Sequence, residues 1–303
     1  MASRGPWFVR SLGLFGASIN EVERTMATSF LVFDVESVAD ADLVARVHYG
    51  GTFEPADALA RYRDELRERY DSDFVPYTFQ VPAVVVVGKV TAEFVLEDIV
   101  ALDEPRFRPH VITENFWRGW ERYRRPTLVS FNGQRFDVPL LELAAFRYGI
   151  SVPGWFQGSK PSDQPRNRFN TTAHIDLCEM LTNFGATRFT GGLNLAANIL
   201  GKPGKMDVQG HMVQDMFAAG QLAEIADYCR CDVLDTYFVF LRSRVLVGRL
   251  TLEQEQRLIA ETKNWIEQRA EKVGAFRLYL DRWGDWPNPW ATGGEPAAEP
   301  LRG

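Results

Sequence analysis

The sequence predicts an α/β domain with a mixed central sheet and helices on both faces. Three β-favouring segments at 29–33, 82–88 and 91–102 come first, close enough together to form an antiparallel meander. A short buried strand is then predicted at 127–131, between two amphipathic helices, and several helices follow it. This order of elements is typical of an α/β domain, whose ligand site is expected at the ends of its strands.

Apolar residues at helical spacing predict the individual helices. Thr113 is the expected N-cap of the helix after the third strand, and Gly149 is expected to end the next helix. The first two helices fall between the first and second strands, so they form an insertion in the sheet. The predicted helices cover residues 39–48, 55–70, 113–124, 138–148, 175–183, 193–200, 211–219, 222–246 and 252–281.

Composition and charge limit the possible functions. The chain of 303 residues carries a net charge of −6, so it lacks the overall positive field of a protein that coats nucleic acid. Any nucleic-acid contact must therefore be local or metal-mediated. Its cysteines form neither a disulfide framework nor a zinc pattern, which fits a reducing cytoplasm. No apolar run approaches the roughly 18 residues that a membrane span needs.

The chain divides into a main domain with additions at both ends. The first residues combine Arg, Ser and Gly with an apolar patch that is too short for a secretory signal, and Met26 precedes the first strand. We therefore expect the functional chain to begin near Met26. The predicted divisions are a poorly ordered extension at 1–25, the main domain at 26–250 with an insertion at about 40–75, a C-terminal helix at 251–283 and a flexible tail at 284–303.

Two acidic residues follow the first apolar run directly, in the segment FDVES at 33–37. Asp34 and Glu36 are two residues apart, a spacing that puts both on one face of a strand. Two like charges at the end of a buried strand are unfavourable unless a cation lies between them. A divalent metal ion is the usual partner, so the pair predicts a metal site.

Two more acids complete the pattern. Asp137 opens a helix just past a strand, where helix capping is the favoured explanation if this residue is taken alone. Asp232 lies beside the apolar face of a late helix, where a surface carboxylate is the alternative. Together the four acids can hold two divalent cations about 3.5–4 Å apart, and hard oxygen ligands favour Mg²⁺ or Mn²⁺ over zinc. Tyr228, one helical turn before Asp232, can orient an attacking water.

Three short motifs in chain order resemble those of a known enzyme superfamily. They are Asp-x-Glu at 34–36, Asn-x-x-x-Phe-Asp at 132–137 and Tyr-x-x-x-Asp at 228–232, and they resemble the motifs of DEDD-superfamily 3′–5′ exonucleases of the tyrosine subclass. The flanking segments are similar to stand-alone exonucleases related to the proofreading domain of family-B DNA polymerases. They are FDVES, SFNGQRFDVPLL, HIDLCEM, LNLAANILGKPGK and YCRCDVLDTYFVFLR, and the resemblance covers about residues 30–244.

The resemblance implies a ribonuclease-H-like fold and a role for each acid. Asp34 would bridge two metal ions, Glu36 and Asp232 would complete the ion on the nucleophile side, and Asp137 would serve the second ion, partly through water. The metals would activate the attacking water and stabilise charge on the phosphate.

The resemblance also implies contacts to the terminal nucleotide. Backbone groups of Ser37 and Val38 would meet the 3′ end, and Asn132 and Phe136 would lie near the last nucleotide. Core packing is an equally good explanation for Phe136. Asp176 is predicted to be structural. Cations in and after the polar loop at 153–172 are candidates for holding the strand, namely Lys160, Arg166, Arg168 and Arg188.

The predicted function is a metal-dependent 3′–5′ exonuclease that acts on the 3′ ends of single-stranded DNA and releases nucleoside monophosphates. No polymerase domain follows, so we expect any proofreading or DNA repair role to be in trans. Two alternatives remain at this point. One is a 3′–5′ exoribonuclease that uses the same site. The other is a non-catalytic nucleic-acid-binding module, which would lack one of the four acids or the tyrosine.

Overall fold

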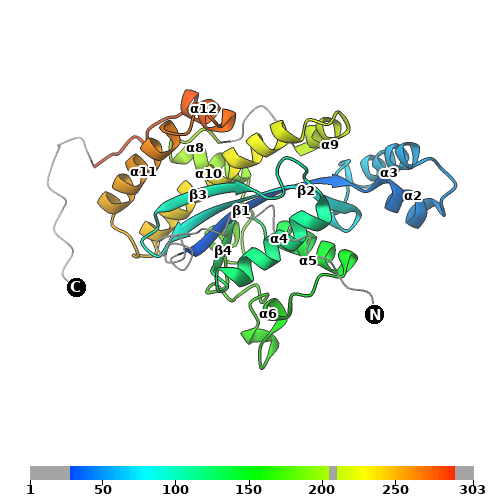
Figure 1. Cartoon of the computed structure of the whole chain (residues 1–303), viewed down its shortest axis with the longest axis horizontal. Helices are drawn as coiled ribbons and strands as arrows, with labels where there is room; N and C mark the ends of the chain where they lie inside the picture. Colours follow the sequence, from blue (N-terminus) through cyan, green and yellow to red (C-terminus); the bar gives the residue numbers. More distant parts are fainter. Residues whose placement is uncertain (1–27, 205–209, 291–303) are drawn as a thin grey trace, which may run out of the picture.

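A five-stranded mixed sheet forms the centre of the molecule (Figure 1), and the computed structural model describes residues 28–204 and 210–290. The strand order is β3-β2-β1-β4-β5. The first three strands pair antiparallel, as the predicted meander requires, whereas β4 and β5 add parallel to β1. The strands are β1 (Thr28–Ala39), β2 (Gln80–Thr91), β3 (Leu96–Ala101), β4 (Thr127–Ser130) and β5 (His174–Asp176).

Successive side chains of β1 point to opposite faces of the sheet. Phe33 faces α4 (Pro109–Arg122), where its ring centroid lies 5.1 Å from that of Phe116. The opposite face meets α10 (Leu222–Leu246). On that face a methyl group on Gly88, the partner of Val32 in the ladder, would lie 3.2 Å from Val233 Cγ1. Asp34 and Glu36 follow Val32 at every second position of the strand, so both acids lie on the same face as Val32 and face α10.

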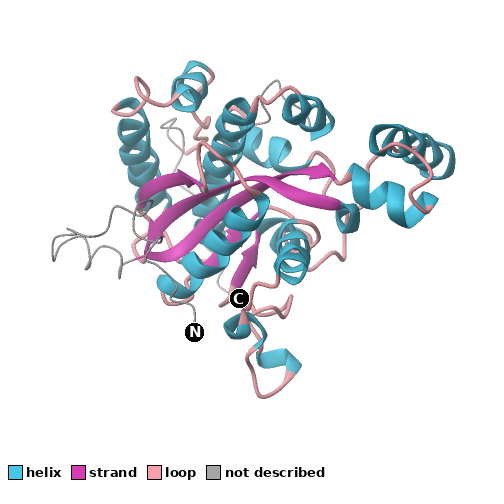
Figure 2. Cartoon of the chain, turned by 45° about the vertical axis from the view of Figure 1, so that its right-hand side comes forward, coloured by secondary structure: helices cyan, strands magenta, loops and turns pink. Residues whose placement is uncertain are grey.

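Helices cover both faces of the sheet, as predicted (Figure 2). On one face lie α4 and α5 (Asp137–Tyr148). On the other face lies α10, which is buried along most of its length because further helices pack against it. Those helices are α8 (Gly192–Ile199), α9 (Gly210–Ala218), α11 (Leu252–Glu267) and α12 (Gly274–Asp281). Short elements join the larger ones: α6 (Pro153–Phe156), α7 (Leu177–Leu181) and the 3-10 turns η1 (Tyr77–Phe79) and η2 (Pro161–Asp163).

The predicted insertion projects from the edge of the molecule, at the right of Figure 1. It contains α2 (Ala41–Tyr49) and α3 (Pro55–Tyr70), which pack on each other. These helices have their own small apolar cluster, separate from the main core. Its buried members are Val44, Ala45, Ala58, Leu59, Tyr62, Leu66 and Val75.

Some predicted boundaries are wrong. The first strand does not end at the acids, because β1 continues through Glu36 to Ala39 and pairs with β2 along this length. Thr113 is not an N-cap. The helix begins four residues earlier, and the Thr113 hydroxyl donates to the Pro109 carbonyl at 2.7 Å inside its first turn.

Two predicted helices are also divided. The segment 175–183 begins with strand β5, and only then continues into α7. The segment 252–281 breaks between Glu267 and Gly274, which lets α12 pack against α10. The third strand is shorter than the predicted 91–102, because Phe94 adopts a left-handed turn conformation with φ 67° before it. The predicted extension at 1–25, Met26 and most of the predicted tail lie outside the described residues.

Within 28–204 and 210–290, no helix combines the length and the apolar character that crossing a membrane requires.

Candidate metal centre

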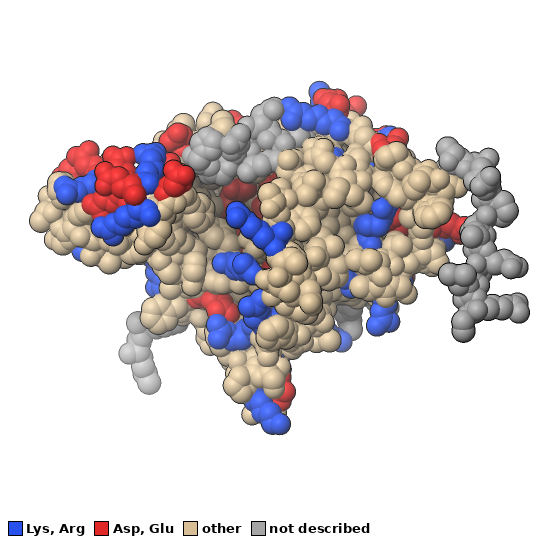
Figure 3. All heavy atoms as spheres, turned by 180° about the vertical axis from the view of Figure 1, so that it is seen from behind, with Lys and Arg blue, Asp and Glu red and all other residues tan. Residues whose placement is uncertain are grey.

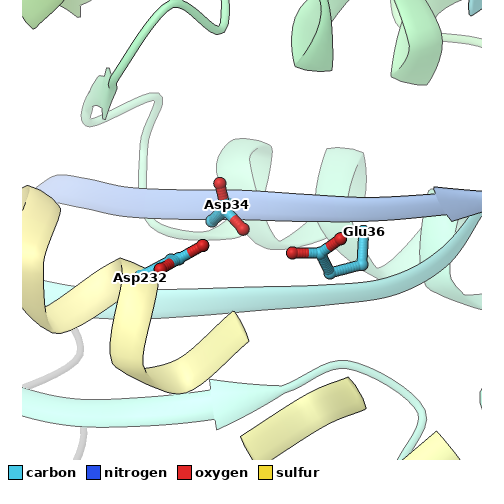
Figure 4. Close-up of side chains that lie close together, drawn as sticks. All are labelled: Asp34, Glu36 and Asp232. Atoms are coloured by element: carbon cyan, nitrogen blue, oxygen red, sulfur yellow. The ribbon is translucent and has the colours of Figure 1, made fainter. Parts of the chain in front are cut away.

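Three carboxylates converge where α10 crosses β1 (Figure 4). Asp34 and Glu36 come from β1, and Asp232 comes from α10. One oxygen of each lies within 4.8 Å of the others. Asp34 stands between the other two side chains in the view of Figure 4. The strand spacing that predicts a shared face for Asp34 and Glu36 therefore holds, and the helix supplies the third acid.

Cys229 connects α10 to the middle of β1. Its thiol lies 3.4 Å from the backbone carbonyl oxygen of Asp34 and 3.3 Å from Asp34 Oδ2, and it donates to both. Burial raises the pKa of the Cys229 thiol well above its ordinary value, and the nearby carboxylates raise it further. The thiol thus stays a neutral donor behind Asp34. Sequence reasoning missed this contact, although Cys229 is three residues before Asp232 and shares its side of the helix.

Tyr228 also lies at the cluster, as its spacing predicts. Its side chain is 6% exposed and forms a hydrogen bond with Asp232. Burial raises the pKa of the Tyr228 phenol, and the charges of the three carboxylates add to the shift. The hydroxyl therefore keeps its proton and is a donor at the edge of the cluster.

Asp137 lies near Asp34 but outside the tight group of three. It is the first residue of α5 and is 6% exposed. Burial raises the pKa of Asp137 well above its ordinary value, and the charges of Asp34 and Asp176 raise it further. Asp137 does not cap α5 through its side chain, because the N-cap position belongs to Phe136 and has no side-chain cap hydrogen bond. As an acid in the first turn of α5 it still suits the helix dipole, as expected.

The loop before Asp137 depends on a glycine. A methyl group on Gly133 would lie 2.7 Å from Asp137 Oδ2 and 2.3 Å from Ser130 Oγ, closer than real contacts allow. Ser130 in turn shares a 2.8 Å hydrogen bond with His174 Nε2. Burial lowers the pKa of His174 to about 3, so its ring is neutral at physiological pH. The close packing around Gly133 was not apparent in the sequence, where Asn132-Gly133 indicates only a turn.

Asp176 holds the same loop from the other side. Its carboxylate accepts backbone N–H bonds from Asn132 and Gln134, each at 2.9 Å. It also accepts from Cys178 and Glu179 at the start of α7. Burial raises the pKa of Asp176, and these N–H donors oppose the shift. The bonds confirm the predicted structural role of Asp176, since they join the loop before Asp137 to α7.

The residues predicted to meet the terminal nucleotide differ in their surroundings. Ser37 is half-buried and its hydroxyl donates to Gln80 Oε1. Val38 is 3% exposed, so its side chain is not available to a ligand, and the predicted backbone contact stays a prediction. Asn132 is exposed in a left-handed conformation with φ 66°. Phe136 is half-buried, and its ring centroid is 5.7 Å from that of Phe74.

The donor set fits a hard divalent cation. The three converging ligands are carboxylates, whose mutual repulsion in a half-buried position is relieved by a cation between them. Oxygen ligands of this kind suit Mg²⁺ or Mn²⁺.

Comparison with known proteins gives one family. A family model described as a predicted 3′–5′ exonuclease related to the exonuclease domain of PolB matches residues 72–283. The matched range includes Asp137, Tyr228 and Asp232 but begins after β1, so Asp34 and Glu36 lie outside it. The match and the order of the mixed sheet confirm the predicted ribonuclease-H-like α/β fold. A search of curated proteins gives no significant match.

Proposed function

Because the chain belongs to the family of predicted 3′–5′ exonucleases related to the exonuclease domain of PolB, we propose that it degrades single-stranded DNA from the 3′ end and releases nucleoside monophosphates. The observation that carries this proposal is the convergence of Asp34, Glu36 and Asp232 within 4.8 Å. Two of these acids lie outside the matched range, so the convergence is support independent of the match. The reducing cytoplasm suits the enzyme, since its three cysteines are free.

We assign the metal ligands as the resemblance to the family implies, and the geometry of the cluster fits this assignment. Asp34 lies between the other two carboxylates (Figure 4) and would be shared by two cations, either Mg²⁺ or Mn²⁺. Glu36 and Asp232 would complete the site on the nucleophile side. Asp137, outside the tight group, would serve the second cation, partly through water. Such ions lower the pKa of a bound water and stabilise negative charge on the phosphate.

The chain's own side chains would orient the reaction. The Tyr228 hydroxyl, which is hydrogen-bonded to Asp232, would hold the attacking water against the cluster. Attack of the water oxygen on phosphorus forms one P–O bond and breaks the bond to the 3′ oxygen of the preceding nucleotide. That oxygen takes a proton, and the terminal nucleotide leaves as a 5′-monophosphate. Cys229 keeps Asp34 in place from behind through its two hydrogen bonds.

Removing the central carboxylate tests the proposal. Asp34→Asn should lower the rate of degradation of a 5′-labelled single-stranded DNA by about 100- to 1,000-fold in Mg²⁺ or Mn²⁺, with shortening from the 3′ end in the wild type. The matched control is Asp64→Asn, because the Asp64 side chain is 69% exposed on α3, and it should leave the rate unchanged.

Other outcomes distinguish the alternatives. Equal degradation by the wild type and Asp34→Asn would contradict the site assignment. Cleavage of a substrate with a blocked 3′ end would indicate an endonuclease. Faster degradation of RNA with the same sequence would make the chain an exoribonuclease. Binding without cleavage, in both cations, would identify a non-catalytic module.

A further inference from the structure

Two phenylalanine rings lie on the surface beside the loop that carries Asp137. Phe169 is 62% exposed and Phe184 is 38% exposed. Their ring centroids are 5.2 Å apart in an edge-to-face arrangement. Neither ring belongs to the buried core or to the half-buried residues around it. Core packing therefore does not explain why these two large apolar side chains occupy these positions.

The backbone presents Phe184 in an unfavourable conformation. Asn183 and Phe184 have φ angles of 51° and 56°, and Gly185 follows at 82°. A left-handed conformation is uncommon for a bulky residue and persists where the surroundings enforce it. Here the Phe184 amide donates to the Glu179 carbonyl at 2.7 Å, and Arg168 donates to the Phe184 carbonyl at 3.2 Å. These contacts hold the backbone that carries the exposed ring.

Two arginines accompany the rings. Arg168 lies 5.3 Å from the ring centroid of Phe169, and both Arg168 and Arg135 pair with the carboxylate of Glu179. Two guanidinium groups therefore share the carboxylate of Glu179, and N–H donors of both arginines remain for a ligand. The arginine side chains are 48% and 59% exposed, whereas that of Glu179 is 3% exposed. We call Arg135, Arg168, Phe169 and Phe184 the aromatic–arginine patch.

The patch is joined to the candidate metal centre. Arg135 is two residues before Asp137, in the loop that Asp176 holds. In the same loop, Gln134 donates its side-chain amide to the Arg168 carbonyl at 3.0 Å. Lys and Arg side chains gather in the middle of the face seen in Figure 3, next to acidic side chains. A strand whose 3′ end reaches Asp34 and Asp137 would therefore pass close to the patch.

We propose that the aromatic–arginine patch binds the single-stranded part of a nucleic acid, upstream of the nucleotide being removed. Unpaired bases stack on the rings of Phe169 and Phe184, and phosphates contact Arg135 and Arg168. Bases in a duplex are already stacked and paired, so they do not reach the rings. This inference rests on the proposed function, and it assigns the preference for single strands to surface residues that lie away from the acids.

Binding can be measured without cleavage. The protein used carries Asp34→Asn, and its Kd for a single-stranded oligonucleotide of about ten nucleotides is measured by fluorescence anisotropy. Adding Phe169→Leu should raise this Kd about tenfold, and adding Phe184→Asn should have a similar effect. Asparagine adopts the left-handed conformation more readily than phenylalanine, so Phe184→Asn should fold at least as well as the parent. The control is Phe146→Leu, since Phe146 is 84% exposed near the C-terminal end of α5 and is not a member of the patch. It should leave Kd unchanged.

Steady-state kinetics of the patch variants with Asp34 intact distinguish the proposal for the patch from the proposed function. The rise in KM caused by the patch variants should grow with substrate length, from a dinucleotide to about ten nucleotides. If the patch variants leave Kd and KM unchanged while the enzyme is an active nuclease, the proposal for the patch is wrong and the proposed function stands. The same holds if Phe146→Leu raises Kd as much as the patch variants do. It also holds if the protein binds a blunt duplex as tightly as a single strand. A wild type without nuclease activity would overturn the proposed function, and the anisotropy measurements would still decide whether the patch binds single strands.

Discussion

Asp34 and Asp235 show how differently one residue type behaves at two depths in this protein. Asp34 lies in a group of carboxylates that a cation would balance. Asp235, on α10, is fully buried, and its Oδ1 accepts the Tyr279 hydroxyl at 2.6 Å. Burial raises the pKa of Asp235 to about 7, against the opposing effects of Tyr279, the Gly204 amide and Lys202. This carboxyl is therefore a structural group whose charge state depends on pH.

The raised pKa of Asp235 predicts a pH dependence of stability. In the unfolded chain this carboxyl loses its proton near its ordinary pKa of about 3.9, whereas in the folded chain it keeps the proton up to about pH 7. The folded state binds more protons in this window, so raising the pH from about 4 to 7 lowers the free energy of unfolding. The contribution is on the order of 4 kcal/mol.

Asp235→Asn isolates this contribution, because the amide oxygen still accepts from Tyr279 but does not titrate. Urea unfolding of both proteins should show that the free energy of unfolding of the variant increases relative to that of the wild type as the pH rises from 4 to 7. Above pH 7 this difference should change little. Asp281→Asn, on the exposed end of α12, controls for loss of a carboxylate. Parallel stability curves for wild type and Asp235→Asn would contradict the prediction.

At the scale of elements, the loop between β4 and α5 determines where Asp137 lies. It is held by two backbone bonds, from Asn132 and Gln134 to Asp176, and by the lack of a side chain at Gly133. A helix that begins at Asp137 without a side-chain cap relies on this loop for its position. The loop thus couples the parallel half of the sheet to the candidate metal centre.

Gly133→Ala should displace Asp137. The added methyl group would meet Asp137 Oδ2 at 2.7 Å, so the carboxylate must shift, and misplacement by about 1 Å can lower activity about 100-fold. We expect this loss in kcat/KM on a single-stranded oligonucleotide. The matched control is Gly119→Ala in α4, where no heavy atom lies within 4 Å. Because alanine favours a helix by roughly 1 kcal/mol, the control should keep its activity and its stability. Equal activity of the two variants would refute a role for the loop in placing Asp137.

At the scale of the whole molecule, the described residues contain two apolar clusters of unequal size. The main cluster spans the sheet and the helices on both faces, and it includes Ile266, Phe276 and Tyr279 from α11 and α12. We therefore propose that α11 and α12 belong to the exonuclease domain, a view that the family match to residue 283 supports. The smaller cluster lies between α2 and α3 at the edge of the molecule.

The smaller cluster should open more readily than the main one. Few buried apolar residues hold α2 and α3, so we expect their amides to exchange hydrogen at least about 100-fold faster than those of α10 under native conditions. Hydrogen-exchange mass spectrometry measures this directly, and α5, in the main cluster, serves as an internal reference. Equal protection of α3 and α10 would show instead that the insertion unfolds only with the rest of the molecule.

Local periodicity determined much of this protein. The strand period put Asp34 and Glu36 on one face, and the helix period put Tyr228 beside Asp232. Helix α10 was predicted with its observed limits, and Gly149 ends α5 in a left-handed conformation, as expected. These features depend on contacts between residues that are close in sequence, so the local sequence is enough to predict them.

Only the tertiary structure decided which surfaces meet. It brought α10 onto the face of β1 that carries the acids, placed the Cys229 thiol against Asp34 and left Asp137 outside the tight group. It also divided the segment 252–281 and set Phe169 beside Phe184. The physical reason is that these contacts join residues far apart in the chain. Their distances depend on how whole helices and loops pack, and no local spacing records that packing.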